Sequence, residues 1–263
     1  MATNMANREQ KNIKLVVASH KPYWMPADSM YVPVQVGAIG KPSIAGFERD
    51  DRGLNISAKN PRYCELTALY WAVNNIDSDY IGLAHYRRHF SGSGDRRTLS
   101  SENAASLLSH ASVILPKRRN YYIETLGSHY AHTHDSRHLE ILGSVIARIA
   151  PAYKADFDSH LSERGGHMFN MMVMRRDLLE EFCDWMFPIL FETERHICFD
   201  GLPPFQERLM GRLSELLVDV WINHIRLEYV EQPIVEMEGT NWVKKGGAFL
   251  AAKAFGKSYE ASF

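Results

Sequence analysis

The chain contains 263 residues, enough for one large domain or two small ones, and its apolar fraction of 45% is typical of a soluble protein core. Lysine and arginine total 30 against 31 acidic residues, so the overall charge argues against a nucleic-acid partner and any basic site must be local. Three scattered cysteines without a CxxC pair exclude a disulfide framework and favour a reducing, cytoplasmic compartment.

The N-terminal part of the chain predicts two strands separated by a proline-containing loop. Residues 1–12 are polar and lack the apolar segment of a signal peptide, so we expect a disordered extension there. The apolar run 13–19 predicts a first buried strand, and residues 31–36 predict a second, shorter one. No apolar run in the sequence reaches the roughly 18–20 residues that a membrane span requires.

The following segments alternate between helix and strand. A helix is expected to begin at Asn60-Pro61, because Asn is a favourable N-cap and Pro fits the first helical position. Further strands are expected at 80–84, 111–115, 168–174 and 227–234, and further helices at 101–110, 121–150, 177–191 (with an internal Pro188) and 205–224. This alternation predicts an α/β fold in which helices flank a mostly parallel sheet.

Basic side chains follow three of the predicted strands at the point where each strand ends. The three strand ends read SHKPY (19–23), HYRR (85–88) and PKRR (116–119). Because ligands of open α/β sheets bind at the carboxyl ends of the strands, we expect these cations to converge on one pocket. Guanidinium groups bind phosphate oxygens bidentately, which favours a phosphate or diphosphate ligand. The alternative is that each cation is a solvated loop residue.

Seven segments of the chain match one bacterial family in order. They are SHKPY (19–23), LNISAKN (54–60), YCELTALYWAVNN (63–75), YIGLAHYRRHF (80–90), ILPKRRNYY (114–122), FNMMVMRRDLLEEFCDWMFPIL (169–190) and QERLMGRLSELL (206–217). Together they strongly resemble a family first described as a domain of unknown function in capsule and exopolysaccharide loci. Members of that family have since been recognised as galactofuranosyltransferases. The resemblance covers residues 13–232.

The resemblance implies a GT-A-like nucleotide-sugar-binding fold, which we assign to residues 13–234. It also implies an inverting transfer of galactofuranose, from UDP-galactofuranose or a related UDP-sugar, onto a saccharide acceptor in capsule, O-antigen or exopolysaccharide biosynthesis. A non-catalytic nucleotide-sugar or glycan-binding module is the alternative. The chain departs from the family pattern at Leu54, where an Asp is usual, at His89, where a Tyr is usual, and at Arg212, where a Phe is usual. A role of the missing Asp would be lost or pass to Asp50 or Asp51.

The arginines after the strand 80–84 are the expected catalytic cations. GT-A enzymes commonly hold a divalent metal with an Asp-x-Asp motif just after a central strand, and here that position is held by HYRR. Arg87 and Arg88, with Lys21 or Lys117 as a further candidate, would instead stabilise the leaving diphosphate. The acid pair at 77–79 lies before its strand and is expected to cap the turn between helix and strand, and the pair at 156–158 lies between helical segments and is expected to belong to a solvated face. We assign no metal, although His85 and His89 leave a metal-assisted reaction open.

The expected donor-binding residues are cationic, aromatic or hydrogen-bonding side chains near these strand ends and helix starts. They are His20, Lys21, Tyr23, Asn55, Ser57, Asn60, Glu65, His85, Tyr86, Lys117, Asn170, Gln206 and Arg208. Helix capping explains Asn60 equally well, and Asn170 is the member of this set that would face the acceptor.

Inversion requires a carboxylate that takes the proton of the acceptor hydroxyl. Our order of candidates is Asp135, which lies among histidines, then Glu215, which matches an acidic position of the family, then Asp200, in a loop before a helix.

The C-terminal tail, residues 235–263, combines large apolar side chains with four lysines. This composition is typical of a short basic amphipathic helix on a membrane surface. Such a tail would suit a polyprenyl-diphosphate-linked acceptor at the inner face of the membrane, and a simple packing tail is the alternative.

Overall fold

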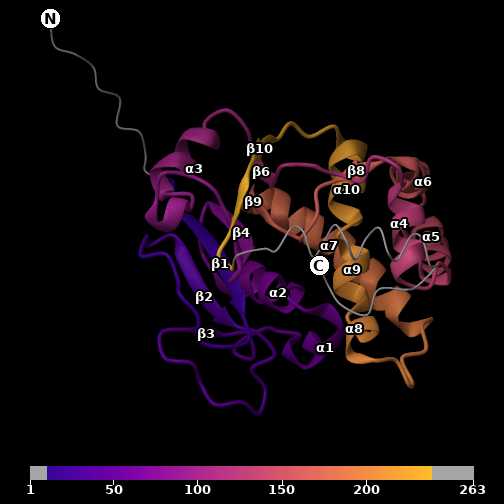
Figure 1. The fold of residues 1–263 in the computed structure, drawn as a ribbon, viewed down its shortest axis with the longest axis horizontal. Helices are drawn as coiled ribbons and strands as arrows, with labels where there is room; N and C mark the ends of the chain where they lie inside the picture. Colours follow the sequence, from indigo (N-terminus) through magenta and orange to yellow (C-terminus); the bar gives the residue numbers. More distant parts are fainter. Residues whose placement is uncertain (1–10, 239–263) are drawn as a thin grey trace, which may run out of the picture.

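The computed structural model describes residues 11–238 of the chain (Figure 1). The expected disorder of residues 1–10 and the expected amphipathic tail beyond residue 238 lie outside the described residues. Within them, no helix is both long enough and apolar enough to cross a membrane. The residue Asn12 already belongs to the folded part, since its backbone nitrogen donates to Asp79 Oδ2 at 2.8 Å.

A nine-stranded sheet forms the centre of the described chain, and seven of its strands follow the order β10-β6-β9-β4-β1-β2-β3. These strands are β1 (Ile13–Ser19), β2 (Tyr31–Gln35), β3 (Glu48–Arg49), β4 (Tyr80–His85), β6 (Val113–Pro116), β9 (Met172–Arg175) and β10 (Val230–Gln232). The strand β5 (Arg88–Phe90) pairs with β4 and with β11 (Ile234–Glu236), and β7 (Arg119–Asn120) pairs with β8 (Gly165–Gly166) in a separate ribbon.

The predicted α/β fold with a mainly parallel sheet is confirmed, with one antiparallel strand at its centre. β1 is parallel to β2 and β4, whereas β9 is antiparallel to both β4 and β6. Consequently β4 and β6 run in the same direction and end at the same edge. The strand expected at 168–174 is shorter than predicted, because the chain makes a left-handed turn at Phe169 and Asn170 before β9 begins.

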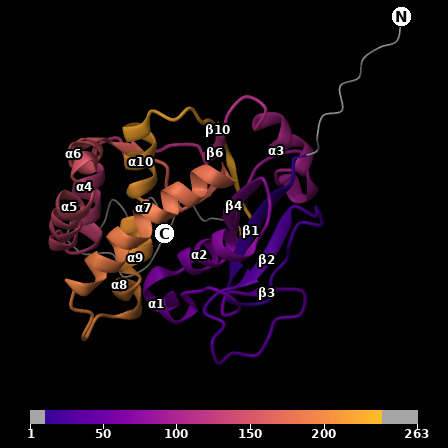
Figure 2. The same ribbon diagram turned by 180° about the vertical axis from the view of Figure 1, so that it is seen from behind.

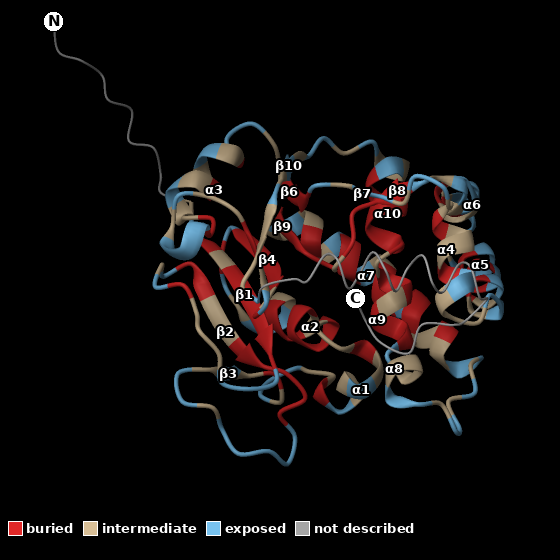
Figure 3. Cartoon of the chain, in the orientation of Figure 1, coloured by how far each residue is buried: buried red, intermediate tan, exposed pale blue. Residues whose placement is uncertain are grey.

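Both faces of the sheet are covered, which explains why β1 and β4 are continuous apolar runs. Along β1, Val16 belongs to the larger core cluster on one face, and Leu15 and Val17 to the smaller cluster on the other. Gly82 in β4 allows close strand contact, since a Cβ there would lie 2.6 Å from the backbone oxygen of Met172. Figure 3 shows the buried residues following the strands and the inner sides of the helices.

Ten α-helices surround the sheet in the described part of the chain. They are α1 (Asn60–Tyr63), α2 (Leu66–Asn75), α3 (Ser101–Leu107), α4 (Leu126–Thr133), α5 (Arg137–Ile149), α6 (Lys154–Ser162), α7 (Arg176–Arg195), α8 (Pro204–Glu207), α9 (Leu209–Ser214) and α10 (Leu217–Ile225). Figures 1 and 2 show α4, α5 and α6 grouped on the side of the molecule away from β2 and β3.

Three helix predictions need correction. The helix expected at 121–150 is divided into α4 and α5, and the helix expected at 205–224 into α8, α9 and α10. Asn60 does not cap its helix. Its side-chain nitrogen donates forward to the backbone oxygen of Cys64 at 2.8 Å and to Thr67 Oγ1 at 3.2 Å. It thereby braces the bend between α1 and α2, where Cys64 has a φ of 51°. Pro188 lies inside α7, as predicted.

Glu194, near the end of α7, joins that helix to the region of α1. Its carboxylate accepts hydrogen bonds from Lys59 Nζ at 2.7 Å, Arg62 Nη1 at 2.9 Å and Tyr63 Oη at 3.0 Å. Burial by itself would raise the pKa of Glu194, but these three donors outweigh it and the pKa is lowered. The contact holds α1 and the residues that follow it against the helical layer.

Replacing Glu194 with glutamine is expected to lower the free energy of unfolding by about 1–3 kcal/mol, because charge-assisted hydrogen bonds are lost. The folded-state pKa is depressed, so this contribution is present above the ordinary glutamate value of 4.5 and is lost as the pH falls through the folded-state value. Urea unfolding at neutral pH and in a series of acidic buffers measures both effects.

Asp158→Asn is the matched control, because Asp158 forms an exposed ion pair with Lys154 within α6. Its expected effect is below about 0.5 kcal/mol. Equal effects of the two substitutions would contradict the anchoring role of Glu194.

Candidate active site

A cavity of about 720 Å³ lies between the carboxyl ends of β1 and β4 and the helices α1, α4, α8 and α9. Its volume falls within the roughly 300–1,000 Å³ range of small-molecule sites. The position also follows the rule that ligands of open α/β sheets bind beyond the carboxyl ends of the strands. The two strand ends supply His20 and the four residues from His85 to Arg88.

The turn after β4 brings two consecutive arginines to the cavity. His85 and Arg88 are paired across this turn, where β4 reverses into β5, so Tyr86 and Arg87 lie at its tip. The ring of Tyr86 is buried and packs edge-on against His20, with 5.3 Å between ring centroids. The packing of Tyr86 against His20 therefore holds in place the turn that carries the two arginines.

His85 connects this turn to the chain that precedes β9. Its Nε2 lies 2.5 Å from the backbone oxygen of Phe169, so Nε2 carries a hydrogen and donates it. Burial lowers the pKa of His85, although the Glu65 carboxylate and the Phe169 carbonyl oppose the shift. The imidazole is accordingly neutral near pH 7 and acts as a hydrogen-bond donor rather than as a cation.

The two arginines have acidic partners on and just after β11, which runs antiparallel to β5. Arg88 Nε lies 3.5 Å from Glu236 Oε1, and Arg87 Nη1 lies 3.5 Å from Glu238 Oε2. The guanidinium of Arg88 also lies 4.5 Å above the ring centroid of Phe169. Ion pairs that are this long and partly exposed contribute little free energy, so both arginines can exchange these partners for an anionic ligand.

Asn170 positions the cavity residue Glu65. Asn170 is 4% exposed and adopts a φ of 53°, a left-handed conformation that Asn tolerates better than most residues. Its Nδ2 donates to Glu65 Oε1 at 2.7 Å and to the backbone oxygen of Gly211 at 3.0 Å, and its Oδ1 accepts from Ser214 Oγ at 2.9 Å. Through these hydrogen bonds Asn170 links the Glu65 carboxylate to α9.

Glu215 is the second carboxylate of the cavity. It follows α9, and its side chain is 16% exposed and lies 3.8 Å from Arg212 Nη1. Burial raises the pKa of Glu215, with a further contribution from the nearby Glu65 carboxylate and opposing contributions from Arg212, Arg119 and Arg88. A carboxylate with a raised pKa is a better proton acceptor than one in water.

The other two acids proposed from the sequence do not line the cavity. Asp135 instead accepts two hydrogen bonds from the side chain of Arg137, at 2.8 and 2.5 Å. These bonds lower the pKa of Asp135 to about 2, which makes it a poor base. Asp200 lies exposed in the loop after α7. The geometry therefore favours Glu215, which the sequence ranked second.

Comparison with known proteins identifies the family. Residues 14–226 match DUF4422, described as a domain of unknown function. The chain belongs to the DUF4422 family. It is also similar to a solved structure described as a WbbM bifunctional glycosyltransferase in its apo form, with a TM-score of 0.80 and 25% sequence identity. The match covers 87% of this chain and 46% of that one, so the chain spans less than half of that relative. No curated protein sequence matches the chain.

The structure divides the residues that the sequence proposed for this DUF4422 chain into two groups. Those that line the cavity are His20, Asn60, Glu65, His85, Tyr86, Arg87, Arg88, Arg208 and Glu215. Those that do not line it are Lys21, Tyr23, Asn55, Ser57, Lys117, Asn170, Gln206, Asp135 and Asp200. Lys21 and Tyr23 lie close by, since Lys21 Nζ is 5.3 Å and the Tyr23 ring 4.9 Å from the centroid of Tyr86.

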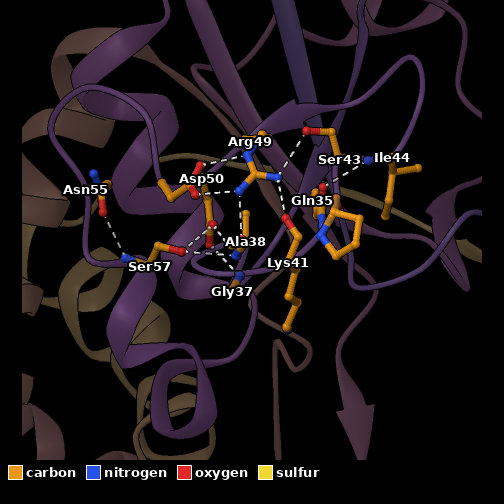
Figure 4. A network of polar contacts seen from close by, with 12 residues as sticks. Gln35, Gly37, Ala38, Lys41, Ser43, Ile44, Arg49, Asp50, Asn55 and Ser57 are labelled. Carbon is orange, nitrogen blue, oxygen red and sulfur yellow. Dashed lines mark hydrogen bonds and ion pairs between the residues drawn. The ribbon is translucent and has the colours of Figure 1, made fainter.

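Asn55 and Ser57 support the loop after β2 (Figure 4). The buried carboxylate of Asp50 accepts hydrogen bonds from the backbone nitrogens of Gly37 at 2.8 Å and Ala38 at 3.0 Å, and from Ser57 Oγ at 2.5 Å. Asn55 Oδ1 accepts from the backbone nitrogen of Ser57 at 3.2 Å. Both side chains are thus engaged by the loop, and Asp50 organises it.

The third cationic strand end reaches the cavity only through Arg119. Arg118 forms an ion pair with Glu163 and donates to the backbone oxygen of Gly165 at 2.6 Å, which joins it to the β7–β8 ribbon. Lys117 follows β6, and β9 separates that strand from β4. The expected convergence therefore holds for both arginines of the second strand end, for His20 but not Lys21 of the first, and for Arg119 alone of the third.

Several cavity residues were missed by the sequence reasoning. They are Cys64, His129, Tyr130, His134, Phe205 and Arg212. His129 and Thr133 lie on one face of α4 because they are four positions apart, and His134, four positions after Tyr130, is the residue that ends the helix. That spacing, in a helix with few large aliphatic residues, was the available signal.

The described residues do not offer the acid pair through which a GT-A enzyme holds a metal. Asp77 and Asp79 lie before β4, at the edge opposite the cavity, and Asp156 and Asp158 pair with His224 and with Lys154. Between residues 11 and 238, no three His, Cys, Asp or Glu side chains are arranged to hold a metal ion.

The double substitution Arg87→Gln/Arg88→Gln is expected to weaken the binding of inorganic diphosphate by at least about tenfold, since charge-assisted hydrogen bonds to the anion are removed. Isothermal titration calorimetry measures the change. Arg175→Gln is the control, because Arg175 pairs with Asp177 at the opposite edge of the sheet, and it should leave the affinity unchanged. Undiminished binding by the double variant would exclude the two arginines as the anion site.

Proposed function

We propose that this chain is a glycosyltransferase that moves a hexose from a UDP-sugar onto a saccharide acceptor. The observation that carries the proposal is one cavity in which Arg87 and Arg88 share the space with the partly buried carboxylates Glu65 and Glu215. The similarity to a WbbM bifunctional glycosyltransferase supports it. The resemblance of the sequence motifs favours UDP-galactofuranose as the donor.

The donor diphosphate would bind at the end of β4. Arg87 and Arg88 supply positive charge there before the reaction begins, so little reorganisation is needed when charge develops on the leaving group. His20 lines the cavity at the end of the parallel neighbour β1, and Arg208 lines it from the end of α8. Guanidinium groups at the ends of β4 and α8 would therefore face the leaving UDP, and the His20 imidazole, whose pKa is lowered by burial, would offer a hydrogen bond. Between residues 11 and 238 there is no group of three His, Cys, Asp or Glu side chains arranged to hold a metal.

Glu215 would act as the general base. It takes the proton of an acceptor hydroxyl, whose oxygen forms the new bond to the anomeric carbon of the donor sugar. The bond between that carbon and the diphosphate oxygen breaks, and its electron pair leaves with UDP, facing Arg87 and Arg88. Attack from the side opposite the leaving group inverts the anomeric centre. Glu65, which Asn170 holds in place, helps to keep the pKa of Glu215 high.

The wider setting follows from the same resemblance. The product would belong to a capsule, O-antigen or exopolysaccharide, and a polyprenyl-diphosphate-linked acceptor at the cytoplasmic face of the membrane is part of the proposal. The part of the tail that follows β11 and Glu238 would supply the membrane contact.

Incubation with enzymatically generated UDP-galactofuranose and a galactoside acceptor tests the proposal directly through release of UDP. Parallel reactions with UDP-galactose and UDP-glucose define the donor. UDP binding without turnover with any donor would instead support a non-catalytic nucleotide-sugar-binding module.

Glu215→Gln is expected to lower kcat by about 10²- to 10⁴-fold, because the proton acceptor is removed, while the Kd for UDP stays unchanged. The wild-type rate should fall as the pH drops through an apparent pKa above the ordinary glutamate value of 4.5, since the base must be deprotonated. Steady-state kinetics across a pH series measures both.

Asp135→Asn is the matched control, because Asp135 is paired with Arg137 outside the cavity. It should retain activity close to that of the wild type. Loss of activity in Asp135→Asn together with an active Glu215→Gln would reassign the base.

A further inference from the structure

One wall of the cavity is formed by planar side chains from α4, α8 and the segment after β7. Tyr121 and His129 lie 4.0 Å apart between ring centroids, Tyr130 and His134 5.0 Å apart, and His134 and Phe205 5.5 Å apart with ring planes inclined by 20°. All five line the cavity. The elements α4 and α8 lie with α9 in the half of the molecule away from β2 and β3 (Figure 1). We refer to these five side chains as the aromatic wall.

The protonation of His134 is fixed by a neighbour behind the wall. Gln206 Nε2 donates to the backbone oxygen of Thr133 at 3.1 Å, so its Oε1 is left to accept from His134 Nδ1 at 2.7 Å. Burial lowers the pKa of His134 to about 4, and Arg212 acts in the same direction. The ring is therefore neutral near pH 7, with its hydrogen on Nδ1 and an unprotonated Nε2.

His129 is arranged in the same way. Its Nδ1 lies 3.0 Å from Glu124 Oε2, which can only accept, so Nδ1 carries the hydrogen. Burial lowers the pKa of His129, although Glu124 opposes the shift. Within residues 11–238, neither His129 Nε2 nor His134 Nε2 makes a hydrogen bond. The wall thus carries two imidazole acceptors that have no hydrogen-bond donor among residues 11–238.

We infer that the aromatic wall is the subsite for the sugar ring of the acceptor. A sugar ring has an apolar C–H face and an edge of hydroxyl groups. The negative faces of the aromatic rings attract the C–H groups, and the two imidazole nitrogens accept from hydroxyls. A diphosphate, which has no hydrogen to donate, gains nothing from such acceptors.

The position of the base agrees with this assignment, which rests on the proposed function. Glu215 follows α9 and lines the same cavity. The charges of Arg119, next to the wall, and of Arg88, at the end of β4, both act to lower its pKa, so both lie within electrostatic reach of the carboxylate. An acceptor ring on the wall would therefore bring a hydroxyl to Glu215 while the donor diphosphate occupies the arginines. Gln206, proposed from the sequence as a donor-binding residue, becomes a positioning residue for His134.

The test uses the full chain, saturating UDP, and a panel of methyl glycosides of galactose, glucose, mannose, rhamnose and N-acetylglucosamine as probes. Saturation-transfer NMR measures glycoside binding, and calorimetry measures the Kd for UDP. We expect at least one glycoside to bind the wild type saturably. Phe205→Ala should weaken that glycoside by at least about tenfold, while the Kd for UDP changes by less than about twofold.

Two further variants separate the subsite from a general loss of structure. Tyr122→Ala removes a ring that is 78% exposed and does not line the cavity, so it should change neither affinity. Gln206→Ala should raise the KM for the acceptor in the transfer reaction while kcat stays within about twofold, because only the orientation and tautomer of His134 are released. A variant that had merely lost structure would lose kcat and UDP binding as well.

Each remaining outcome has a defined meaning. Failure of the wild type to bind UDP would reject the proposed function. UDP binding with no glycoside bound, or with equal binding by the wild type and Phe205→Ala, would overturn the acceptor subsite alone. A parallel loss of UDP and glycoside in Phe205→Ala would assign the wall to the nucleotide base and also overturn it.

Discussion

Repulsion between guanidinium groups is the constraint on which the site depends. Arg87, Arg88, Arg119, Arg208 and Arg212 all line one cavity, and like charges in partly buried surroundings repel more strongly than in water. Each has a compensating contact. Arg87 and Arg88 pair with the acids on and after β11. The Arg119 guanidinium lies 5.2 Å from the centroid of the Tyr121 ring, and Arg208 Nε donates to Cys64 Sγ at 3.1 Å. Arg212 Nη1 lies 3.8 Å from the Glu215 carboxylate. These contacts are weak enough to be replaced by a stronger anion.

The same constraint explains why carboxylates occur beside the cations. Glu65 and Glu215 reduce the net positive charge of the cavity, and the Glu65 carboxylate adds to the rise that burial causes in the pKa of Glu215. Asn170 holds Glu65 in place by donating a hydrogen bond to its carboxylate, and Asn170 is itself hydrogen-bonded to Gly211 and Ser214. Glu215 is left with Arg212 at the longer distance of 3.8 Å. Glu65 is therefore held in one position, whereas Glu215 keeps a raised pKa.

The sequence could predict features that depend on neighbouring residues in the chain. The apolar runs of β1 and β4 and the cations that follow them are local signals, and they located the edge of the sheet where the cavity lies. The motifs led to the correct family, because they combine many such signals over most of the chain.

The proposed base and the aromatic wall depend on tertiary burial, which the sequence does not display. Asp135 stood among histidines and ranked first, but Arg137 two positions later neutralises it locally. Burial in the folded cavity raises the pKa of Glu215, and Glu65, a residue remote in sequence, adds to this shift. Similarly, Asn55 and Ser57 had the right chemistry for sugar hydroxyls, and only the folded loop shows that Asp50 engages Ser57.

The pairing of β5 with β11 has a consequence for how the molecule folds. Arg87 and Glu238 are 151 residues apart along the chain, and we expect such a contact to form slowly because closing the loop between distant segments costs conformational entropy. Until β11 docks, the arginines at the end of β4 lack these acidic partners and oppose the collapse of the surrounding segments. An anion that binds there would screen them during this interval, so small polyanions should accelerate the last step of refolding as well as occupy the finished site.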